Sequence, residues 1–301
     1  MKGRPLLLVL ATAVALGVVF VVVLSLATFL SGGRVASGPL AAVGGGKVAL
    51  VKIEGLLVTP EHVVEELHDY AEDASIKAIV LRIDSPGGGV VASQEIFNAV
   101  KNAKKEGKKV VASMGSVAAS GGYYVAAAAD KIVANPGTLT GSIGVKMEFA
   151  SVEKLLEKIG VKGMVVKAGE YKDIGSPFRD MTEQEQKLLQ GVIDDVHSQF
   201  IEAVAEGRGL PATDVKAIAD GRIFTGRQAL ALKLVDEMGD LADSIRVAGK
   251  LAGIKGKPNV VERKKNIPFL DYLKEESAAW ISDVVSNSVN RNTVTLQYRL
   301  H

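Results

Sequence analysis

Two glycine-rich turns carry the groups in this chain that are best suited to chemistry. Ser120 stands in the sequence VAASGG, between an apolar run and an alanine-rich run, and residues 84–89 read DSPGGG. A serine at a strand-to-helix turn places its hydroxyl at a helix N-terminus, where unbonded backbone N–H groups favour negative charge. That geometry suits a nucleophile that attacks a carbonyl carbon. The alternative interpretation is an N-cap serine on a buried helix.

The DSPGGG turn offers backbone N–H groups that could stabilise an oxyanion. Both turns follow apolar runs that are typical of parallel strands, and ligands bind at the carboxyl ends of such strands. If the two strands are neighbours, the glycines at 87–89 come close to Ser120, and the N–H of Gly121 completes an oxyanion hole. The turn lacks both the Lys-Ser/Thr pair and the GxGxxG spacing of phosphate loops. A glycine-rich turn without chemistry stays open as the alternative.

A serine nucleophile needs a base, and histidine is scarce here. The chain has only four histidines: His62, His68, His197 and His301. The first two are expected on the solvated face of a helix, and His301 ends the chain. His197 falls within a predicted amphipathic helix over residues 181–208, where packing or surface exposure is its expected role. A Ser-His-Asp triad is therefore hard to place.

Lysine is the other side chain that could serve as the base. Desolvation lowers the pKa of a lysine, so that it can accept a proton near neutral pH. The candidates are Lys146, Lys167 and Lys172, and spacing does not choose among them. Lys172 lies in the polar loop GEYKDIGSPFRD, between a predicted strand over residues 163–167 and the helix at 181–208. A solvated loop lysine is the alternative reading of that residue.

Composition excludes several classes of function. The chain has 301 residues, a net charge of +2 and no cysteine. A charge this close to balance gives no argument for nucleic-acid binding. The lack of cysteine rules out disulfides, thiol catalysis and cysteine metal sites. With so few histidines as well, we expect neither a metal nor a cofactor.

The N-terminal segment is expected to anchor the chain in a membrane. Residues 6–30 contain no charged side chain, and about 20 apolar residues suffice to span a bilayer as a helix. The run is longer than the core of a cleavable signal peptide. Lys2 and Arg4 precede it, so the positive-inside rule places this end in the cytoplasm and the remaining chain outside. The expected organisation is an anchor (1–30), a flexible Gly/Ser/Ala linker (31–46), a catalytic domain (47–255) and a C-terminal tail (256–301).

The domain alternates strands and helices. Strands are predicted at 47–58, 77–83, 108–114 and 130–135, with helices at 60–73, 90–107 and after Ser120. This order implies crossover units and a largely parallel sheet in an α/β fold. Further helices are predicted at 226–239 and 243–253, an edge strand at 257–266, and an amphipathic helix within 267–287. The end of the chain, TVTLQYRLH, alternates like an extended strand.

Four motifs in order resemble the signal peptide peptidase A family: DSPGGG, GSVAASGGYYVAAAAD, NPGTLTGSIGV and YKDIGSPFR. This is peptidase family S49, whose members are membrane-anchored Ser-Lys peptidases with a Clp-protease/crotonase-like (ββα superhelix) fold. The resemblance covers about residues 47–255. It implies Ser120 as nucleophile, Lys172 as general base, and Ser142 as a hydroxyl that orients the lysine, although a plain turn serine is the alternative for Ser142. The implied oxyanion donors are the Gly87–Gly88 turn and Gly121.

The resemblance also implies an assembly and a substrate class. One copy of each motif matches the family's short form, whose subunits form a ring-like, octamer-like dome with each serine and lysine pair shared between neighbours. Expected substrates are signal-peptide remnants and other extended apolar peptides, cleaved outside the cytoplasm. The C-terminal tail is expected either to enter the groove and be trimmed or to cover a surface. Two other classes remain as rivals: an acyl-CoA enzyme on the crotonase fold, and a catalytically silent membrane scaffold.

Overall fold

A computed structural model describes residues 46–263 of the chain. The predicted anchor, the linker before Gly46, and the predicted helix and strand of the C-terminal tail lie outside this range. Among the described residues, no helix is both long and apolar enough to cross a bilayer.

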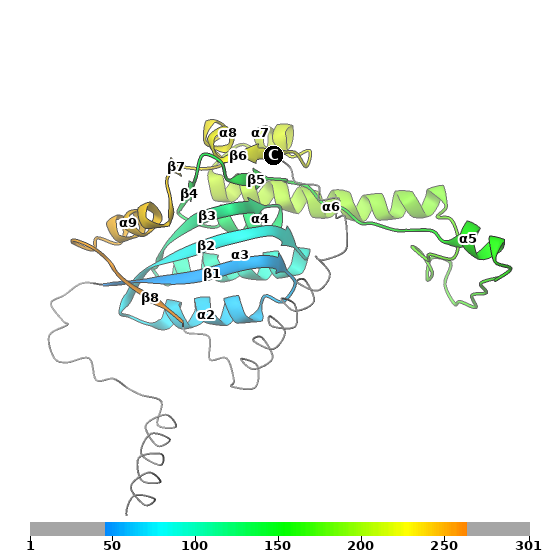
Figure 1. The fold of residues 1–301 in the computed structure, drawn as a ribbon, viewed down its shortest axis with the longest axis horizontal. Coiled ribbons are helices and arrows are strands. Elements are labelled where there is room, and N and C mark those ends of the chain that lie inside the picture. Colours follow the sequence, from blue (N-terminus) through cyan, green and yellow to red (C-terminus); the bar gives the residue numbers. More distant parts are fainter. Residues whose placement is uncertain (1–45, 264–301) are drawn as a thin grey trace, which may run out of the picture. The chain divides into compact units, whose positions relative to one another are not determined.

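A single mixed sheet organises the domain (Figure 1). Its path runs β6-β5-β3-β2-β1-β8, and β4 pairs with β3 and β7. Every pairing is parallel except that of β5 with β6. The prediction of a largely parallel sheet is thus confirmed. The strands are β1 (Lys47–Leu57), β2 (Ile76–Gly88), β3 (Lys109–Ala119), β4 (Lys131–Ala134), β5 (Leu139–Gly141), β6 (Ile223–Thr225), β7 (Glu237–Met238) and β8 (Asn259–Glu262).

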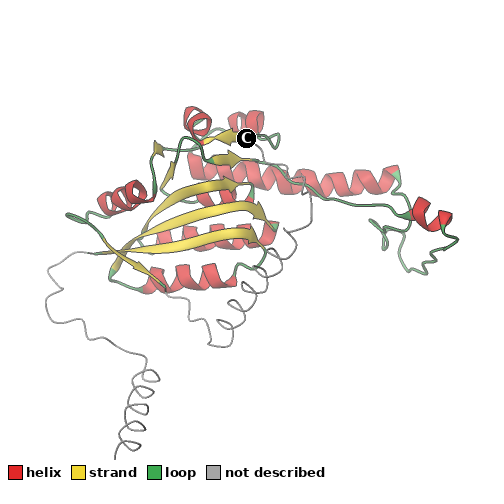
Figure 2. Ribbon diagram, viewed as in Figure 1, coloured by secondary structure: helices red, strands yellow, loops and turns green. Residues whose placement is uncertain are grey.

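Helices cover both faces of the sheet, and this explains why its central strands are apolar throughout (Figure 2). Successive side chains of a strand point to opposite faces. In β2, Ile79 and Leu81 pack in the larger core with α2, α3 and α4, whereas Ala78 and Val80 pack in a second cluster with α9. The helices are α2 (Glu61–Glu72), α3 (Val90–Lys105), α4 (Gly121–Ala127) and α9 (Leu241–Leu251).

The long helix α6 (Glu183–Arg208) connects the sheet domain to an extension that we call the arm, residues 144–182. A capping box between Thr182 and Glu185 begins the helix, and Gly209 ends it in the left-handed conformation. The last turns of α6 pack closely on α4, because a Cβ on Gly207 would lie 2.0 Å from the Ala127 carbonyl oxygen. Its first turns run beside the arm, which contains one short helix, α5 (Glu153–Lys158) (Figure 1).

Several sequence-based boundaries need correction. The strand predicted at 163–167 is wrong, because these residues are an exposed loop that pairs with no strand among residues 46–263. The helix predicted at 226–239 ends early: α8 covers Gly226–Ala231, and β7 follows at 237–238. The edge strand expected near 257–266 is confirmed as β8, which pairs with β1 and so extends the sheet beyond residue 255.

The strands that lead into the two glycine turns are longer than predicted. β2 continues to Gly88 and β3 to Ala119, so both turns are strand ends rather than loops after strands. A register shift between Ile83 and Ser85 lets β3 bulge and then pair again at Ala118. The remaining helix, α7 (Ala212–Ile218), lies between α6 and β6.

Candidate active site

Ser120 occupies a strained corner between β3 and α4. Its backbone has φ 52° and ψ −122°, a conformation that residues other than glycine rarely adopt. Strain of this kind is concentrated at functional sites, and a sharp strand-to-helix turn is how α/β-hydrolases expose a nucleophilic serine. The Ser120 carbonyl oxygen accepts the first helical hydrogen bond from Tyr124 N–H at 2.8 Å, and its side chain makes no capping bond. The N-cap interpretation therefore lacks the bond on which it depends.

The two glycine turns touch each other at this corner. A Cβ on Gly87, whose φ is +104°, would lie 2.6 Å from the Gly121 nitrogen and 2.8 Å from the Ser120 Cβ. No side chain can be accommodated there without a backbone shift. Because β2 and β3 are adjacent, their ends meet as the sequence predicts.

The backbone donors at the corner are not equivalent. The Gly87 N–H donates to Ser85 Oγ at 3.1 Å, and this hydroxyl donates to the Gly55 carbonyl at 2.6 Å. Gly121 is the first residue of α4, where N–H groups have no intrahelical acceptor. The Gly88 nitrogen would lie 3.3 Å from a Cβ on Gly121. The backbone nitrogens of Gly88 and Gly121 therefore lie close together beside Ser120, while Gly87 permits the close approach.

Ser142 lies beside Ser120 through strand pairing. Ala119 of β3 is the register partner of Gly141 of β5, and the Ser120 N–H donates to the Gly141 carbonyl at 2.8 Å. Ser142 also has φ 52°, and its N–H donates to the Arg222 carbonyl at 2.8 Å. Two serines with positive φ thus end neighbouring strands, and both line the same cleft.

That cleft has a volume of about 780 Å³ and joins the glycine turns to α6. Behind Ser120, the Tyr124 ring lies 5.0 Å from the rings of both Phe97 and Phe200. Tyr123 is fully buried and donates to the Leu234 carbonyl at 2.9 Å. Both tyrosines thus have packing roles behind the Ser120 corner. Apolar residues that line the cleft include Leu56, Val90, Val145, Ile193, Val196 and Phe200.

The candidate lysines do not gather at this cleft. Lys146 lines it, but its exposed ammonium pairs with Glu148 at 2.7 Å. Lys167 pairs with Asp173 within the arm. Lys172 is exposed in the loop before α6 and is not among the residues that line the cleft.

The arm loop is attached to the first turn of α6, whereas the α6 residues that line the cleft run from Gln190 to Phe200. Asp173 is linked through Arg179 to Glu185, in the first turn of α6. His197, which lines the cleft, comes 12 residues after Glu185. At 1.5 Å of rise per residue, this separation is about 18 Å along the helix axis. A single chain therefore assembles the serines and glycines without Lys172.

His197 is a cleft residue whose position sequence reasoning missed. It lies on α6 as predicted, yet it faces the same cleft as Ser120, and its Nε2 is buried without a hydrogen-bond partner among the described residues. His62 and His68 are exposed on α2, as expected. The signal for His197 was its spacing from Ile193 and Phe200, which puts all three on one helix face.

Comparisons with known proteins show the family of the chain. Residues 102–255 match the model of peptidase family S49, and residues 58–138 match that of Clp protease. A Synechocystis protein named as a protease is 47% identical over 218 residues, which cover 72% of this chain and 77% of that protein. This chain belongs to peptidase family S49. Its domain is accordingly a mixed α/β domain of the Clp-protease type.

Other S49 relatives are matched over smaller shares of their length. An Enterococcus faecium protein named signal peptide peptidase SppA is 38% identical over 194 residues, 64% of this chain and 56% of that protein. The chloroplastic serine protease SPPA of Arabidopsis thaliana is 37% identical over 217 residues, 70% of this chain and 32% of the plant protein. The family resemblance inferred from the four motifs is thus confirmed.

Proposed function

We propose that this S49-family chain is a serine endopeptidase with Ser120 as its nucleophile. The observation that carries the proposal is the strained Ser120 corner, which packs against the Gly87–Gly88 turn at the start of α4 and lines a cleft. Backbone donors fixed at such a corner stabilise the charge that develops on a carbonyl oxygen during attack.

The proposed mechanism uses a Ser-Lys dyad. Ser120 Oγ bonds to the peptide carbonyl carbon while its proton passes to neutral Lys172, and the oxyanion accepts hydrogen bonds from Gly88 and Gly121. The lysinium then protonates the leaving amine as the C–N bond breaks. Water then bonds to the acyl carbon and gives a proton to the lysine. The lysinium returns this proton to Ser120 Oγ as the ester C–O bond breaks, and the carboxylic acid product leaves and ionises. Ser142 orients the lysine amine through its hydroxyl.

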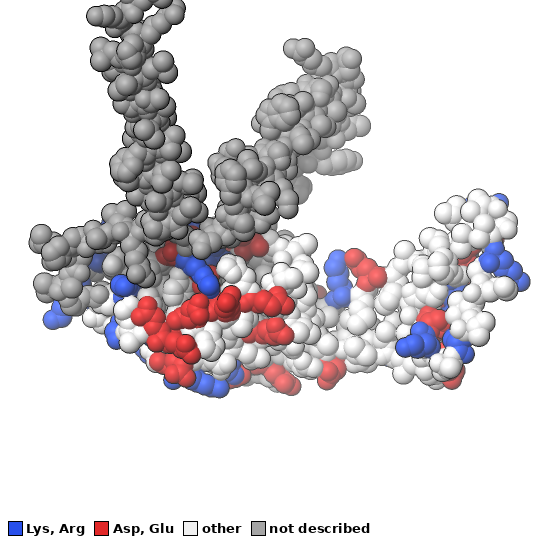
Figure 3. Space-filling view, turned by 90° about the horizontal axis from the view of Figure 1, so that it is seen from below, with Lys and Arg blue, Asp and Glu red and all other residues white. Residues whose placement is uncertain are grey.

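The lysine of each site comes from a neighbouring subunit in this proposal. Two observations support it: Lys172 does not line its own cleft, and the arm that carries it exposes an unusual amount of apolar surface. Figure 3 shows the arm as the extension on the right, with much of its surface uncharged. Large exposed apolar patches mark interaction sites. The exposed apolar residues of the arm are Met147, Phe149, Leu155, Ile159, Val161, Met164, Val165, Val166 and Phe178. In a closed, octamer-like ring, every arm contacts a neighbouring subunit.

The proposed substrates are extended apolar peptides, including remnants of signal peptides. The apolar lining of the cleft suits such chains, and one relative carries the name signal peptide peptidase. An anchor at residues 6–30 would hold the protein in the membrane where these remnants remain, with the catalytic domain outside the cytoplasm. An extended substrate can pair its backbone with an exposed strand edge.

The decisive experiment compares the full chain in detergent with its Ser120→Ala, Lys172→Ala and Ser142→Ala variants. A signal-sequence peptide is the substrate, and mass spectrometry identifies the products. We expect the first two substitutions to lower the rate by at least about 10⁴-fold, as for other catalytic units. We expect Ser142→Ala to be impaired but active. Unchanged turnover by Ser120→Ala would overturn the proposal.

The same variants, with two further measurements, separate the rival functions. Retained activity in Lys172→Ala alone would point to another base, of which His197 is the candidate in the cleft. A crotonase-type enzyme would instead gain thermal stability with acyl-CoA. A silent scaffold would neither cleave the peptide nor react at Ser120 with a serine-directed probe.

A further inference from the structure

The turn that carries Lys172 is held by charged groups on both sides. Arg179 donates to both carboxylate oxygens of Asp173, with Nε–Oδ2 and Nη2–Oδ1 distances of 3.0 Å each. Lys167 Nζ donates to the Glu170 carbonyl at 2.7 Å and also to the Asp173 carboxylate. Glu170 and Asp173 flank Lys172 closely, so its backbone is tied before and after the residue.

Arg179 joins this turn to the start of α6. Its Nη1 donates to Glu185 Oε2 at 2.8 Å, and its Nη2 donates to the other oxygen of that carboxylate. Glu185 is only 3% exposed and is the acidic member of the capping box, where it accepts from the Thr182 N–H at 2.9 Å. The guanidinium therefore links the Lys172 turn to the capping box that begins α6.

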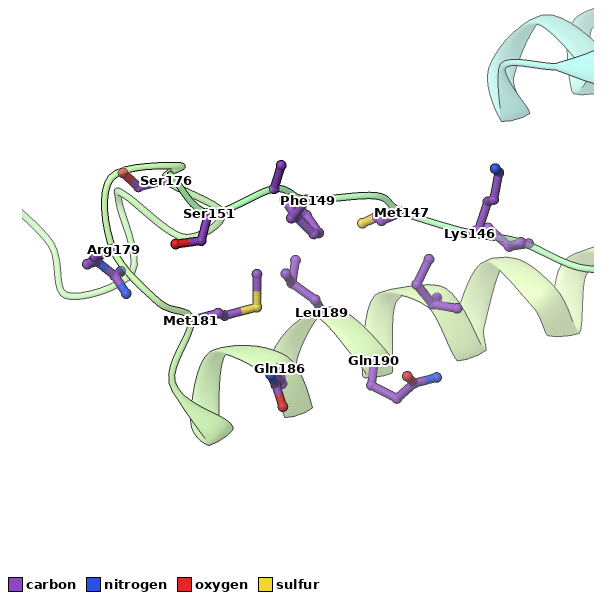
Figure 4. A pocket seen from close by; sticks show the side chains of 14 residues that line it. Lys146, Met147, Phe149, Ser151, Ser176, Arg179, Met181, Gln186, Leu189 and Gln190 are labelled. Carbon is purple, nitrogen blue, oxygen red and sulfur yellow. The ribbon is translucent and has the colours of Figure 1, made fainter. Parts of the chain in front are cut away.

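The charges around this turn and its packing agree with a preformed link. Hydrogen bonds from Arg179 lower the pKa of Glu185 to about 2, and those of Arg179, with Lys167, hold the pKa of Asp173 well below its usual value. Phe149 packs against the same turn, since a Cβ on Gly175 would lie 2.6 Å from its ring. Figure 4 shows Phe149 above Leu189 of α6, with Arg179 and Ser176 at the end of the same groove.

Lys172 itself is left available by this network. Its N–H donates to the Gly169 carbonyl at 3.3 Å, but within residues 46–263 no side chain forms a hydrogen bond or ion pair with its Nζ. A lysine side chain is long and flexible, so the position of its amine depends on a fixed backbone. A misplacement of about 1 Å at a reacting group can cost about 10²-fold in rate.

We propose that Arg179 is a positioning residue for the general base, acting through Asp173 to hold the Lys172 turn against α6. This inference rests on the proposed function, in which Lys172 enters the cleft of a neighbouring subunit. It assigns a role to the ion-pair network of the arm that neither the nucleophile nor the oxyanion donors require.

The test compares Arg179→Gln, Asp173→Asn and the double variant in the full chain in detergent, with a signal-sequence peptide. Arg179→Gln should lower kcat about 10²-fold with KM within about twofold, because the base is misplaced while the cleft is intact. The double variant should lose no more than the worse single variant, since both act through one link. Arg246→Gln, which breaks a surface pair with Asp243 on α9, is the matched control and should retain wild-type kcat.

The pH dependence of kcat/KM distinguishes a positioning role of Arg179 from a merely structural one, because loss of structure alone would not shift it. Without Arg179, the Asp173 carboxylate beside the base is compensated only by Lys167 and so favours the charged lysine, and the rising limb of the profile should move to higher pH. Asp173→Asn leaves the cations without their carboxylate, so that limb should move to lower pH. Shifts of opposite sign support the proposal, and unshifted limbs in both variants oppose it.

Two measurements keep the outcomes distinct. Thermal unfolding and the mass of the detergent-solubilised assembly show whether Arg179→Gln is folded and assembled; if it is, and kcat equals that of wild type, the positioning role is overturned. If Arg179→Gln does not assemble, Asp173→Asn carries the test with the same criteria. An active Lys172→Ala protein would instead overturn the proposed role of Lys172 as the base, on which the inference rests.

Discussion

At the scale of single residues, the site is built from backbone conformations that cost energy. Ser120 and Ser142 both have φ 52°, and a residue held in such a region costs on the order of 1–3 kcal/mol. The surrounding sheet offsets this cost, because each serine is bonded through its N–H to an adjacent strand or loop. The pairing of β3 with β5 and the bond from Ser142 to Arg222 thus hold the two strained backbones. Both serines then line one cleft.

We predict that Gly87→Ala damages both stability and catalysis. The added methyl group would meet the Gly121 nitrogen at 2.6 Å, and the position has φ +104°. Overpacking and a strained φ together should lower the free energy of unfolding by about 2–5 kcal/mol. Displacement of the oxyanion donors should lower kcat by about 10²-fold or more.

Chemical denaturation and peptide cleavage measure these two effects. Gly137→Ala is the matched control, because its added Cβ would meet nothing within 4 Å and its φ is not positive. Wild-type stability and kcat in Gly87→Ala would contradict the close contact between the two turns.

At the scale of elements, α6 links two regions with different surroundings. Its final turns are buried against α4, with Phe200 and Val204 in the core, while its first turns are held by the capping box and the arm. One rigid helix therefore supports both the wall of the cleft and the loop of the proposed base. Average helices are much shorter than its 26 residues.

We predict that the arm loosens in acid before the sheet domain does. The pKa of Glu185 falls from 4.5 to about 2 in the folded chain, and that of Asp173 is lowered as well. Because the unfolded carboxylates bind protons first as the pH falls, their stabilisation is complete above about pH 5 and is lost between about pH 4.5 and 2.

Hydrogen exchange at several pH values, corrected for the intrinsic exchange rate, tests this prediction. Protection of amides in residues 144–182 should fall over that window, while protection in β2 and β3 persists. Arg179→Gln should remove most of this pH dependence, whereas Arg246→Gln should keep it. Equal loss of protection in arm and sheet would contradict the prediction.

At the scale of the whole molecule, the arm exposes a large apolar surface of the kind that marks an interaction site. Val166 is fully exposed and Met164 is 87% exposed, both in a loop without secondary structure. Contact with a neighbouring subunit would bury these side chains and would bring the Lys172 loop to a second cleft. Catalysis would then require assembly, because each cleft would receive its lysine from a neighbouring subunit.

Val166→Asp should therefore prevent assembly and abolish activity together. A carboxylate buried without a partner would cost enough to weaken association by about a hundredfold or more. Analytical ultracentrifugation in detergent measures the assembly, and peptide cleavage measures the activity. Val166→Ile, which keeps an apolar side chain, should behave as wild type; an assembled and active Val166→Asp protein would exclude this loop from the interface.

Co-expressed Ser120→Ala and Lys172→Ala subunits should recover activity that neither has alone. In random assemblies, about a quarter of the sites receive an intact serine from one subunit and an intact lysine from the next, because each has a one-half chance. A recovery near this fraction of the wild-type rate supports sharing. No recovery in assemblies shown by mass to be mixed would place both residues in one subunit.

Local patterns in the sequence predict much of the domain but not its irregular parts. The continuous apolar runs of β2 and β3 identify strands buried on both faces, and the glycines around Ser120 identify the corner. The run at 163–167 is also apolar, yet it forms no strand, because strand formation requires a pairing partner that no local pattern reports. The bulge that returns β3 to β2 at Ala118 is likewise a property of the pair.

Residues that are close in the chain are enough to predict the family, the Ser120 corner, the scarcity of histidine and the loop that carries Lys172. The folded chain is needed to show that Ser142 directly follows the strand beside Ser120, that Gly87 bonds to Ser85, and that His197 reaches the cleft. It also placed Lys172 on an arm held by Arg179 rather than in its own cleft. These facts depend on strand register and on helix packing between segments far apart in sequence, which local composition does not specify.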